Sequence, residues 1–307
     1  MEKILNTDDE IICGFKVSAA RKQVWQAELE MVELFIKICE QNNLKYVASG
    51  GTLLGAVRHG GFIPWDDDID LMMPRSDYEK FLEIGQELLP EGFFLQSCKT
   101  EKNYFYGHAQ IRNCNTTCFI PSDYANMQRG KNLGIFIDIF PYDEIPDNLK
   151  LYKKQTKKIK LIKRLIKFKL DNRYGGFLKK FIKKVISTGY FLIHGVEKQI
   201  KKIDKLSQKY SGGRVALISF LPGYEKNVWS ENLFAETTKC KFENLEINIP
   251  LHYDEVLKKE FNDYMQIPED KGGSIHGKCF FDTKRPYTHY LNLTTREFDE
   301  LFEKFVL

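Results

Sequence analysis

The sequence lacks the features that mark secreted and membrane-spanning proteins. Its first residues, MEKILNTDDE, show no basic stretch followed by an apolar run, so we expect no secretion signal. No run of about 20 apolar residues is present to span a bilayer. The longest stretch without Lys, Arg, Asp or Glu in the middle of the chain, 185–196, contains a histidine and two glycines. We therefore expect a protein that is soluble or peripheral to a membrane.

Cysteines are too few and too scattered to form a dense framework. The chain has seven of them, an odd number, and only Cys114 and Cys118 lie close together. No second pair follows at the spacing that is typical of a zinc site. The pattern favours reduced thiols in the cytosol over disulfides or a structural zinc ion.

The net charge of +4 is unevenly distributed along the chain. The segment 150–205 carries 19 Lys or Arg against 3 Asp or Glu, so the rest of the chain is net acidic. Apolar and basic side chains in this segment fall on different faces of predicted helices. The apolar face includes positions 177, 178, 181, 182, 185 and 186, and the basic face includes Lys179, Lys180, Lys183 and Lys184.

Basic amphipathic helices suit an anionic membrane surface, where each Lys or Arg contributes about 1 kcal/mol. We therefore predict that 150–205 contacts an anionic membrane. The alternative is that the apolar faces pack on the rest of the protein and the lysines are solvated. Nucleic acid is the other polyanion that a basic segment binds. No nucleic-acid-binding module accompanies this segment, so we expect no nucleic acid partner.

Hydrophobic periodicity divides the chain into three parts. Helices and strands alternate over 1–148, which predicts a catalytic core of the α+β class. The basic helical segment occupies 149–209, and a mixed part over 210–307 is expected to complete the active site and its acceptor side. The main predicted elements are helices at 21–43, 53–59, 77–89 and 253–264, strands at 46–49, 68–73, 93–96, 107–112, 134–140 and 214–220, and a hairpin at 239–250.

Three aspartates form the strongest chemical signal. Asp68 and Asp70 are two residues apart on a predicted strand and would face the same side. Asp138 lies between Ile137 and Ile139 on another predicted strand, where a lone carboxylate is costly to bury unless it is paired or binds a metal ion. Three neighbouring carboxylates suit Mg²⁺ or Mn²⁺. The alternative is that the acidic stretch is a solvated surface turn.

A glycine pair precedes the aspartates. Gly50, Gly51 and Thr52 stand before a predicted helix, where backbone N–H groups and the helix N-terminus can bind a phosphate. Arg58 and His59 end that helix and are further candidates for phosphate contact. The alternatives are an ordinary glycine turn and a surface arginine.

Three blocks of sequence resemble the LicD family of phosphotransferases, whose motif also occurs in the fukutin-related proteins. The first block is SGGTLLGAVRHGGFIPWDDDIDLMMPRSDYEKF at 49–81, the second is GIFIDIFPYD at 134–143, and the third is FNDYMQIPEDKGGSIHGK at 261–278. The third block departs from the family pattern. Phe261 and Asn262 replace the usual Tyr-Gly, and Glu269 stands where a second proline is common, which bears on the acceptor more than on catalysis.

The resemblance implies a nucleotidyltransferase-like fold with a mixed sheet flanked by helices, and a Mg²⁺-dependent site with Asp68, Asp70 and Asp138 as ligands. It also implies transfer of phosphocholine, or of another phosphorylated alcohol, from a CDP-linked donor to a sugar hydroxyl. The acceptor would be a lipid-linked precursor of teichoic acid, capsule or lipopolysaccharide, on the cytoplasmic face of the plasma membrane. Choline, ribitol, glycerol and ethanolamine all remain open as the alcohol.

The predicted reaction needs a base and a pocket for the alcohol. Asp138 would deprotonate the acceptor hydroxyl, with Asp67 and His276 as alternatives. A choline group favours an aromatic cage. Two other functions stay open, a nucleotidyltransferase that releases pyrophosphate and a non-catalytic protein that binds glycan or lipid. The aromatic candidates are Trp65, Tyr104, Tyr106 and Tyr142.

Overall fold

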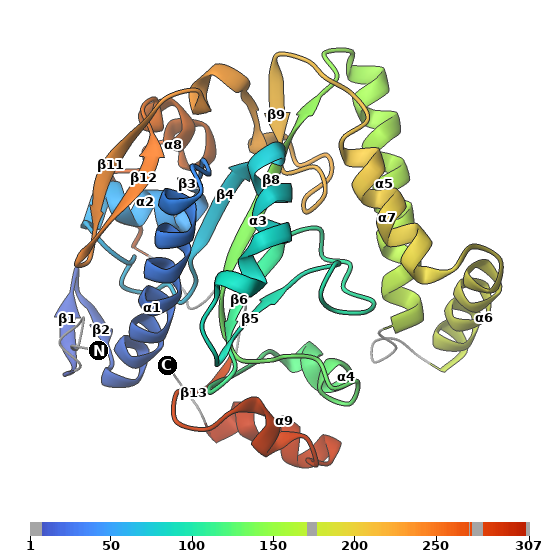
Figure 1. Ribbon diagram of the computed structural model, residues 1–307. Coiled ribbons are helices and arrows are strands. Elements are labelled where there is room, and N and C mark those ends of the chain that lie inside the picture. Colours follow the sequence, from blue (N-terminus) through green and yellow to red (C-terminus); the bar gives the residue numbers. More distant parts are fainter. Residues whose placement is uncertain (1–7, 171–176, 270, 272–278, 305–307) are drawn as a thin grey trace.

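A seven-stranded mixed sheet forms the centre of the computed structural model, which describes residues 8–170, 177–269, 271 and 279–304 (Figure 1). The strands run in the order β10-β9-β8-β4-β3, and β6 pairs with β8 and with β5. Strands β4 and β8 are parallel, and the other pairs are antiparallel. The predicted mixed sheet flanked by helices is therefore confirmed. The strands are β3 Val47–Ala48, β4 Asp70–Pro74, β5 Phe93–Gln96, β6 Ala109–Asn113, β8 Ile135–Ile145, β9 Arg214–Ala216 and β10 Val228–Ser230.

Helices α1 (Ala19–Gln41) and α3 (Arg75–Leu88) pack on the sheet and on each other (Figure 1). The ring of Phe35 in α1 meets that of Phe81 in α3 at 5.2 Å, and both side chains are fully buried. The backbone N–H of Arg21 donates to the side chain of Ser18, which caps the start of α1. The predicted helix at 21–43 is thus confirmed, with its start set two residues earlier by this cap.

Helix α2 (Gly50–His59) connects β3 to β4 and carries the predicted glycine pair in its first turn. It ends at Gly60, whose left-handed backbone at φ +68° is readily adopted by glycine. Its neighbours are the hairpin of β11 (Thr237–Phe242) and β12 (Leu245–Pro250) and helix α8 (Tyr253–Phe261). The sequence interval between α2 and these neighbours is long, so only tertiary packing brings them together.

The basic segment is helical, as predicted, and forms α5 (Leu149–Leu170), α6 (Phe177–His194) and α7 (Val196–Ser207). Its buried apolar side chains join the far end of the sheet in a second core, in which Ile159, Ile203 and Ile145 take part. The apolar faces of α5 and α7 are therefore largely used for packing inside the protein. None of the helices that the structure describes is both long and apolar enough to cross a bilayer.

Three predicted strand limits were wrong. The strand predicted at 214–220 ends at Ala216, because pairing with β8 and β10 stops there. Strand β4 begins at Asp70, so Asp68 lies in the preceding irregular segment and not on the same strand face. Strand β8 continues through Pro141 to Ile145 instead of ending at the proline. Pairing with β6 ends at Ile139 and pairing with β9 begins at Asp143. The proline therefore occupies a local edge, where its missing N–H leaves no ladder bond unmade.

Several elements were not predicted. Five of them hold only three or four residues, too few to show a period, whereas the ten-residue helix α9 was missed. Strands β7 and β13 pair near the last helix, and β1 pairs with β2 near the first. Their limits are β1 Glu10–Ile12, β2 Phe15–Val17, β7 Thr117–Phe119, α4 Tyr124–Met127, β13 Phe280–Asp282 and α9 Thr295–Lys304.

Candidate active site

Two of the three predicted aspartates lie side by side on the parallel strands at the centre of the sheet. Asp70 opens β4, and its register partner in β8 is Asp138. The N–H of Asp138 donates to the carbonyl of Ile69 at 2.8 Å, which fixes this register. Register partners lie about 4.8 Å apart on neighbouring strands and carry their side chains on the same face of the sheet. The pair therefore presents two carboxylates together.

The start of α2 lies against the first of these carboxylates. Thr52 Oγ1 accepts from the N–H of Asp70 at 2.8 Å, and the N–H of Ser49 donates to the carbonyl of Asp70 at 3.0 Å. Gly50 has φ +52°, and a Cβ atom there would lie 3.3 Å from Asp70 Oδ2. A Cβ atom on Gly51 would lie 2.7 Å from Asp66 Oδ2. A side chain at either glycine would thus occupy the space where carboxylates meet the helix N-terminus.

The electrostatics of Asp70 are those of a crowded acidic site. Burial raises its pKa well above the usual range, and the charges of Asp68, Asp138, Asp66 and Glu260 raise it further. A bound cation would offset this repulsion and lower the pKa again. The donor set of hard carboxylate oxygens therefore fits Mg²⁺ or Mn²⁺.

The carboxylates do not form a closed metal cage by themselves. In the part of the chain that the structure describes, no group of three or more His, Cys, Asp or Glu side chains is arranged to hold an ion. Mg²⁺ is commonly held by one or two carboxylates together with water and substrate phosphates. The Asp70–Asp138 pair beside a helix N-terminus matches that manner of binding.

Asp138 has two neighbours that the sequence did not reveal. His108 Nε2 lies 2.9 Å from Asp138 Oδ1, and Gln110 Nε2 donates to the same oxygen at 2.8 Å. The buried ring of His108 packs against those of Phe140 and Phe220, each at 4.8 Å. A usable signal existed, since polar residues alternate with apolar ones from His108 onward in a predicted strand. Nothing in the sequence, however, says which strand lies beside β6.

Lys163 of α5 holds the loops around His108. Its Nζ donates to the carbonyls of Tyr106 and Ser219 at 2.8 Å and of Phe220 at 3.0 Å. Burial lowers the pKa of Lys163 to about 7. The basic segment, through Lys163, therefore helps to hold the two loops that surround His108.

Asp67 lies on the other side of the acidic loop. It is 4% exposed and lines a small cavity together with Glu28, Asp68 and Cys118. Glu28 is 1% exposed, and burial followed by the charges of Asp67 and Asp68 raises its pKa well above the usual range. Asp67 therefore faces a buried carboxyl rather than the glycine turn.

The predicted phosphate contacts Arg58 and His59 lie at the opposite end of α2 from Gly50, about 12–14 Å away along the helix axis. Arg58 donates to the carbonyls of Tyr264 at 2.8 Å and Gln266 at 3.3 Å, and through Nε to His59 at 2.9 Å. Burial, and then the charge of Arg58, lowers the pKa of His59 to about 4. His276 lies outside the described residues.

The four predicted aromatic residues have ring contacts in three separate groups. Trp65 contacts Phe15 and His59. Tyr104 and Tyr106 contact each other at 5.1 Å, and each lies 6.2 Å from His108. Tyr142 contacts Phe234 at 5.4 Å. Only the Tyr104–Tyr106 pair is thus linked through His108 to Asp138.

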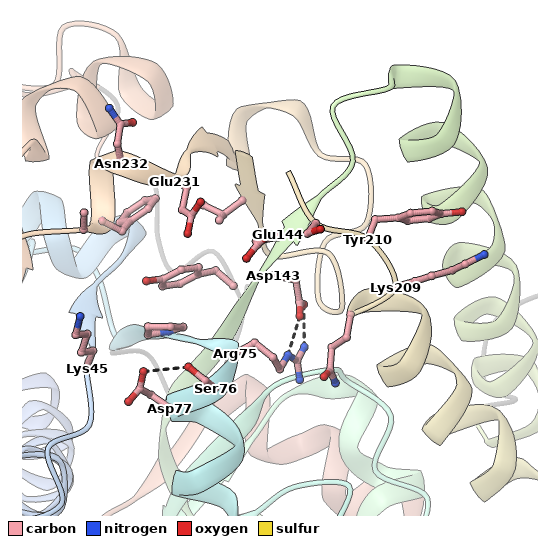
Figure 2. A pocket seen from close by; sticks show the side chains of 17 residues that line it. Lys45, Arg75, Ser76, Asp77, Asp143, Glu144, Lys209, Tyr210, Glu231 and Asn232 are labelled. Atoms are coloured by element: carbon pink, nitrogen blue, oxygen red, sulfur yellow. Dashed lines mark hydrogen bonds and ion pairs between the residues drawn. The ribbon is translucent and has the colours of Figure 1, made fainter. Parts of the chain in front are cut away.

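A groove of about 870 Å³ opens at the far end of β4 and β8 (Figure 2). It is lined by aromatic, acidic, basic and amide side chains, among them Tyr142, Tyr210 and Glu231. Arg75 lies at its base and forms two hydrogen bonds, of 2.7 and 2.8 Å, to Asp143. Such a mixture of rings and hydrogen-bonding groups suits a polyhydroxylated ligand.

Glu260 of α8 gives a test of the acidic site in the folded protein. Burial raises its pKa from 4.5 to about 7, so the folded protein holds this proton more tightly than the unfolded chain. The free energy of unfolding therefore falls as pH rises through that window. We expect Glu260→Gln to be more stable than the wild type above pH ~7, by about 1–2 kcal/mol, and equally stable below pH ~4.

Urea unfolding across this pH range, in the presence of a chelator, measures the difference. Glu255→Gln on the same helix is the control, since its side chain is 67% exposed and should leave the pH profile unchanged. If the free energy of unfolding depends on pH in the same way for the wild type and for Glu260→Gln, the raised pKa of Glu260 is refuted.

The mixed sheet, the paired aspartates and the glycine turn together define a nucleotidyltransferase-like domain. Residues 43–173 match the family described as LicD/FKTN/FKRP, nucleotidyltransferase domain. The segment 43–173 thus matches a LicD-type nucleotidyltransferase domain, and the resemblance seen in the sequence is confirmed.

Two transferases of known name are similar to the chain. It is 27% identical to the lipopolysaccharide cholinephosphotransferase LicD of Haemophilus influenzae over 253 residues, which cover 81% of this chain and 92% of that protein. It is 26% identical to the ribitol 5-phosphate transferase FKRP of Mus musculus over 113 residues, or 37% of this chain and 20% of that protein. Both relatives are transferases of a phosphate-containing group.

Proposed function

We propose that this protein transfers a phosphorylated alcohol, phosphocholine or a similar group, from a CDP-linked donor to a sugar hydroxyl. The observation that carries the proposal is the pairing of Asp70 with Asp138 beside the N-terminus of α2. It brings hard anionic ligands and helix N–H groups to one place, which is the arrangement that metal-assisted phosphoryl chemistry requires. The two named relatives transfer groups of this class.

Asp70 and Asp138, with Asp68 beside them, would hold Mg²⁺ or Mn²⁺. When bound, the ion would neutralise charge on the donor diphosphate and orient its phosphorus. The glycines at positions 50 and 51 leave room for the diphosphate to approach the helix N-terminus, since neither carries a Cβ atom. Thr52 holds the backbone of Asp70 in position through its hydroxyl.

In the proposed step, the acceptor oxygen forms a bond to the phosphorus that carries the alcohol. The bond from that phosphorus to CMP breaks, and CMP leaves. The hydroxyl proton passes to the carboxylate of Asp138. Gln110 and His108 fix the orientation of that carboxylate through Oδ1, which directs its other oxygen toward the reactants.

We place the acceptor glycan in the groove of Figure 2. Tyr142 lies four residues beyond Asp138 on β8, so both side chains share one face of the strand, about 13 Å apart. A chain of sugar units is long enough to bind at Tyr142 while its reacting hydroxyl reaches Asp138. A lipid-linked precursor of teichoic acid, capsule or lipopolysaccharide at the inner face of the plasma membrane would meet this requirement.

Isothermal calorimetry with CDP-choline, CDP-ribitol, CDP-glycerol and CTP, each with and without Mg²⁺, tests the proposal. We expect one CDP-alcohol to bind only with Mg²⁺, and Asp70→Asn to abolish this binding or weaken it about tenfold or more. Asp147→Asn is the control, since that side chain is 72% exposed. Binding of CTP alone, with pyrophosphate as product, would favour a nucleotidyltransferase. No nucleotide binding would favour a non-catalytic glycan- or lipid-binding protein.

A further inference from the structure

Helix α6 exposes large apolar side chains on the face that points away from the protein. Leu192 and Ile193 are 82% and 80% exposed, and Val185 and Ile186 are 54% and 59% exposed. Figure 1 shows α6 at the outer edge of the molecule, beyond α5 and α7. A surface helix normally turns polar side chains to water, so this face calls for a partner.

The exposed side chains form one continuous stripe. At 100° per residue, positions 185, 186, 189, 192 and 193 fall within an arc of about 120°. The packing side of the helix lies opposite, where Ser187 is fully buried and Phe191 is 7% exposed. Helix α6 is thus apolar on both sides, and its neighbours within the protein cover only one of them.

Exposed lysines accompany this stripe on the same helix and on the helix that follows it. Lys184 on α6 and Lys198, Lys201 and Lys202 on α7 are exposed. The two described acidic residues of the segment are engaged elsewhere. Glu197 accepts from the N–H of Asn103 at 2.7 Å, and Asp204 pairs with Arg75 at 2.9 Å. The lysines therefore face solvent with their charge largely uncompensated by the acids of their own segment.

We propose that the outer stripe of α6, formed by Val185, Ile186, Leu192 and Ile193, inserts into the surface of an anionic phospholipid bilayer. Exposed apolar side chains match the acyl boundary of such a surface, and the exposed lysines on α6 and α7 match its negative headgroups. A second copy of the chain fits less well, because it would bring two strongly basic segments together. The stripe thus acts as a docking surface independently of the chemistry at the aspartates.

Flotation of the full-length protein with phosphatidylcholine vesicles, with and without phosphatidylserine, tests the proposal. We expect binding to the phosphatidylserine vesicles that weakens with salt. The double variant Leu192→Ser/Ile193→Ser should reduce the partition coefficient about tenfold or more, because two nearly fully exposed aliphatic side chains lose their buried area in lipid. Ile11→Ser is the matched control, since Ile11 is 76% exposed on β1 and should have no effect.

Equal flotation of the double variant and the wild type would overturn the proposal. So would a concentration-dependent dimer in lipid-free solution that the double variant abolishes, because the stripe would then be a contact between copies. An unchanged thermal unfolding midpoint for the double variant is expected, since both side chains are exposed. Loss of flotation with retained binding of the CDP-alcohol would support membrane docking apart from the proposed chemistry.

Discussion

Replacing Asp70 by Asn is expected to lower kcat for group transfer by about 10³-fold or more. The substitution keeps the size of the side chain and the backbone bond from Asp70 to Thr52, and removes one of two register-paired carboxylates. Without that charge, the site loses the ligand that would hold the metal ion against the donor diphosphate. Asp138→Asn should have an effect of similar size, since it also removes the proposed base. Release of CMP from the donor identified by calorimetry measures both.

The stability of Asp70→Asn separates loss of chemistry from loss of folding. Burial and four neighbouring carboxyl groups raise the pKa of Asp70, so the ionised form is unfavourable in the metal-free protein. We therefore expect the metal-free variant to unfold at the same temperature as the wild type or above it. The exposed Asp147→Asn serves as the control and should retain full activity. Turnover of Asp70→Asn near that of the wild type would exclude the proposed site.

Replacing Arg75 by Met is expected to lower the free energy of unfolding by about 3–5 kcal/mol, the loss typical of breaking a buried ion pair. Arg75 binds both carboxylate oxygens of Asp143, at 2.7 and 2.8 Å, and Asp204 at 2.9 Å. The side chain of Asp143 is only 1% exposed. Arg75 therefore joins β8, α3 and α7, and its removal leaves a buried carboxyl without its cation. Urea unfolding at neutral pH measures the loss.

Two further variants test whether the loss of stability in Arg75→Met comes from the buried carboxyl of Asp143: an exposed ion pair as a control and a double variant as a rescue. Lys16→Met breaks an ion pair of 2.8 Å with Asp9 whose side chains are 70% and 50% exposed, and should leave the free energy of unfolding almost unchanged. The double variant Arg75→Met/Asp143→Leu should recover much of the loss, because no buried carboxyl remains. Burial already raises the pKa of Asp143, so protonation limits the loss in Arg75→Met at low pH. A loss below 1 kcal/mol at neutral pH would show that the network contributes little.

Helices and strands could be predicted from the sequence where the hydrophobic pattern repeats over enough residues to show its period. Helix α1, strand β5 and the hairpin of β11 and β12 lie within a few residues of their predicted limits. The predicted strand limits at Asp68 and Pro141 were wrong because they depend on tertiary pairing and not on the local pattern. Whether a residue belongs to a strand depends on the partner beside it. On one side of β8 the partner changes from β6 to β9 near the proline, while β4 continues to pair along the other side.

The sequence by itself determined which residues are candidates for the centre of the site, because a carboxylate between isoleucines and a glycine pair before a helix are local patterns. Asp138, Gly50 and Gly51 were predicted this way. Asp70 was predicted from its spacing to Asp68 on one strand, but the structure pairs it with Asp138 instead. Only the tertiary structure decided that His108 and Glu260 approach this pair and that Arg58 does not. These distances follow from strand order and helix docking. Such long-range packing is set by the burial of whole faces, and no short stretch of sequence encodes it.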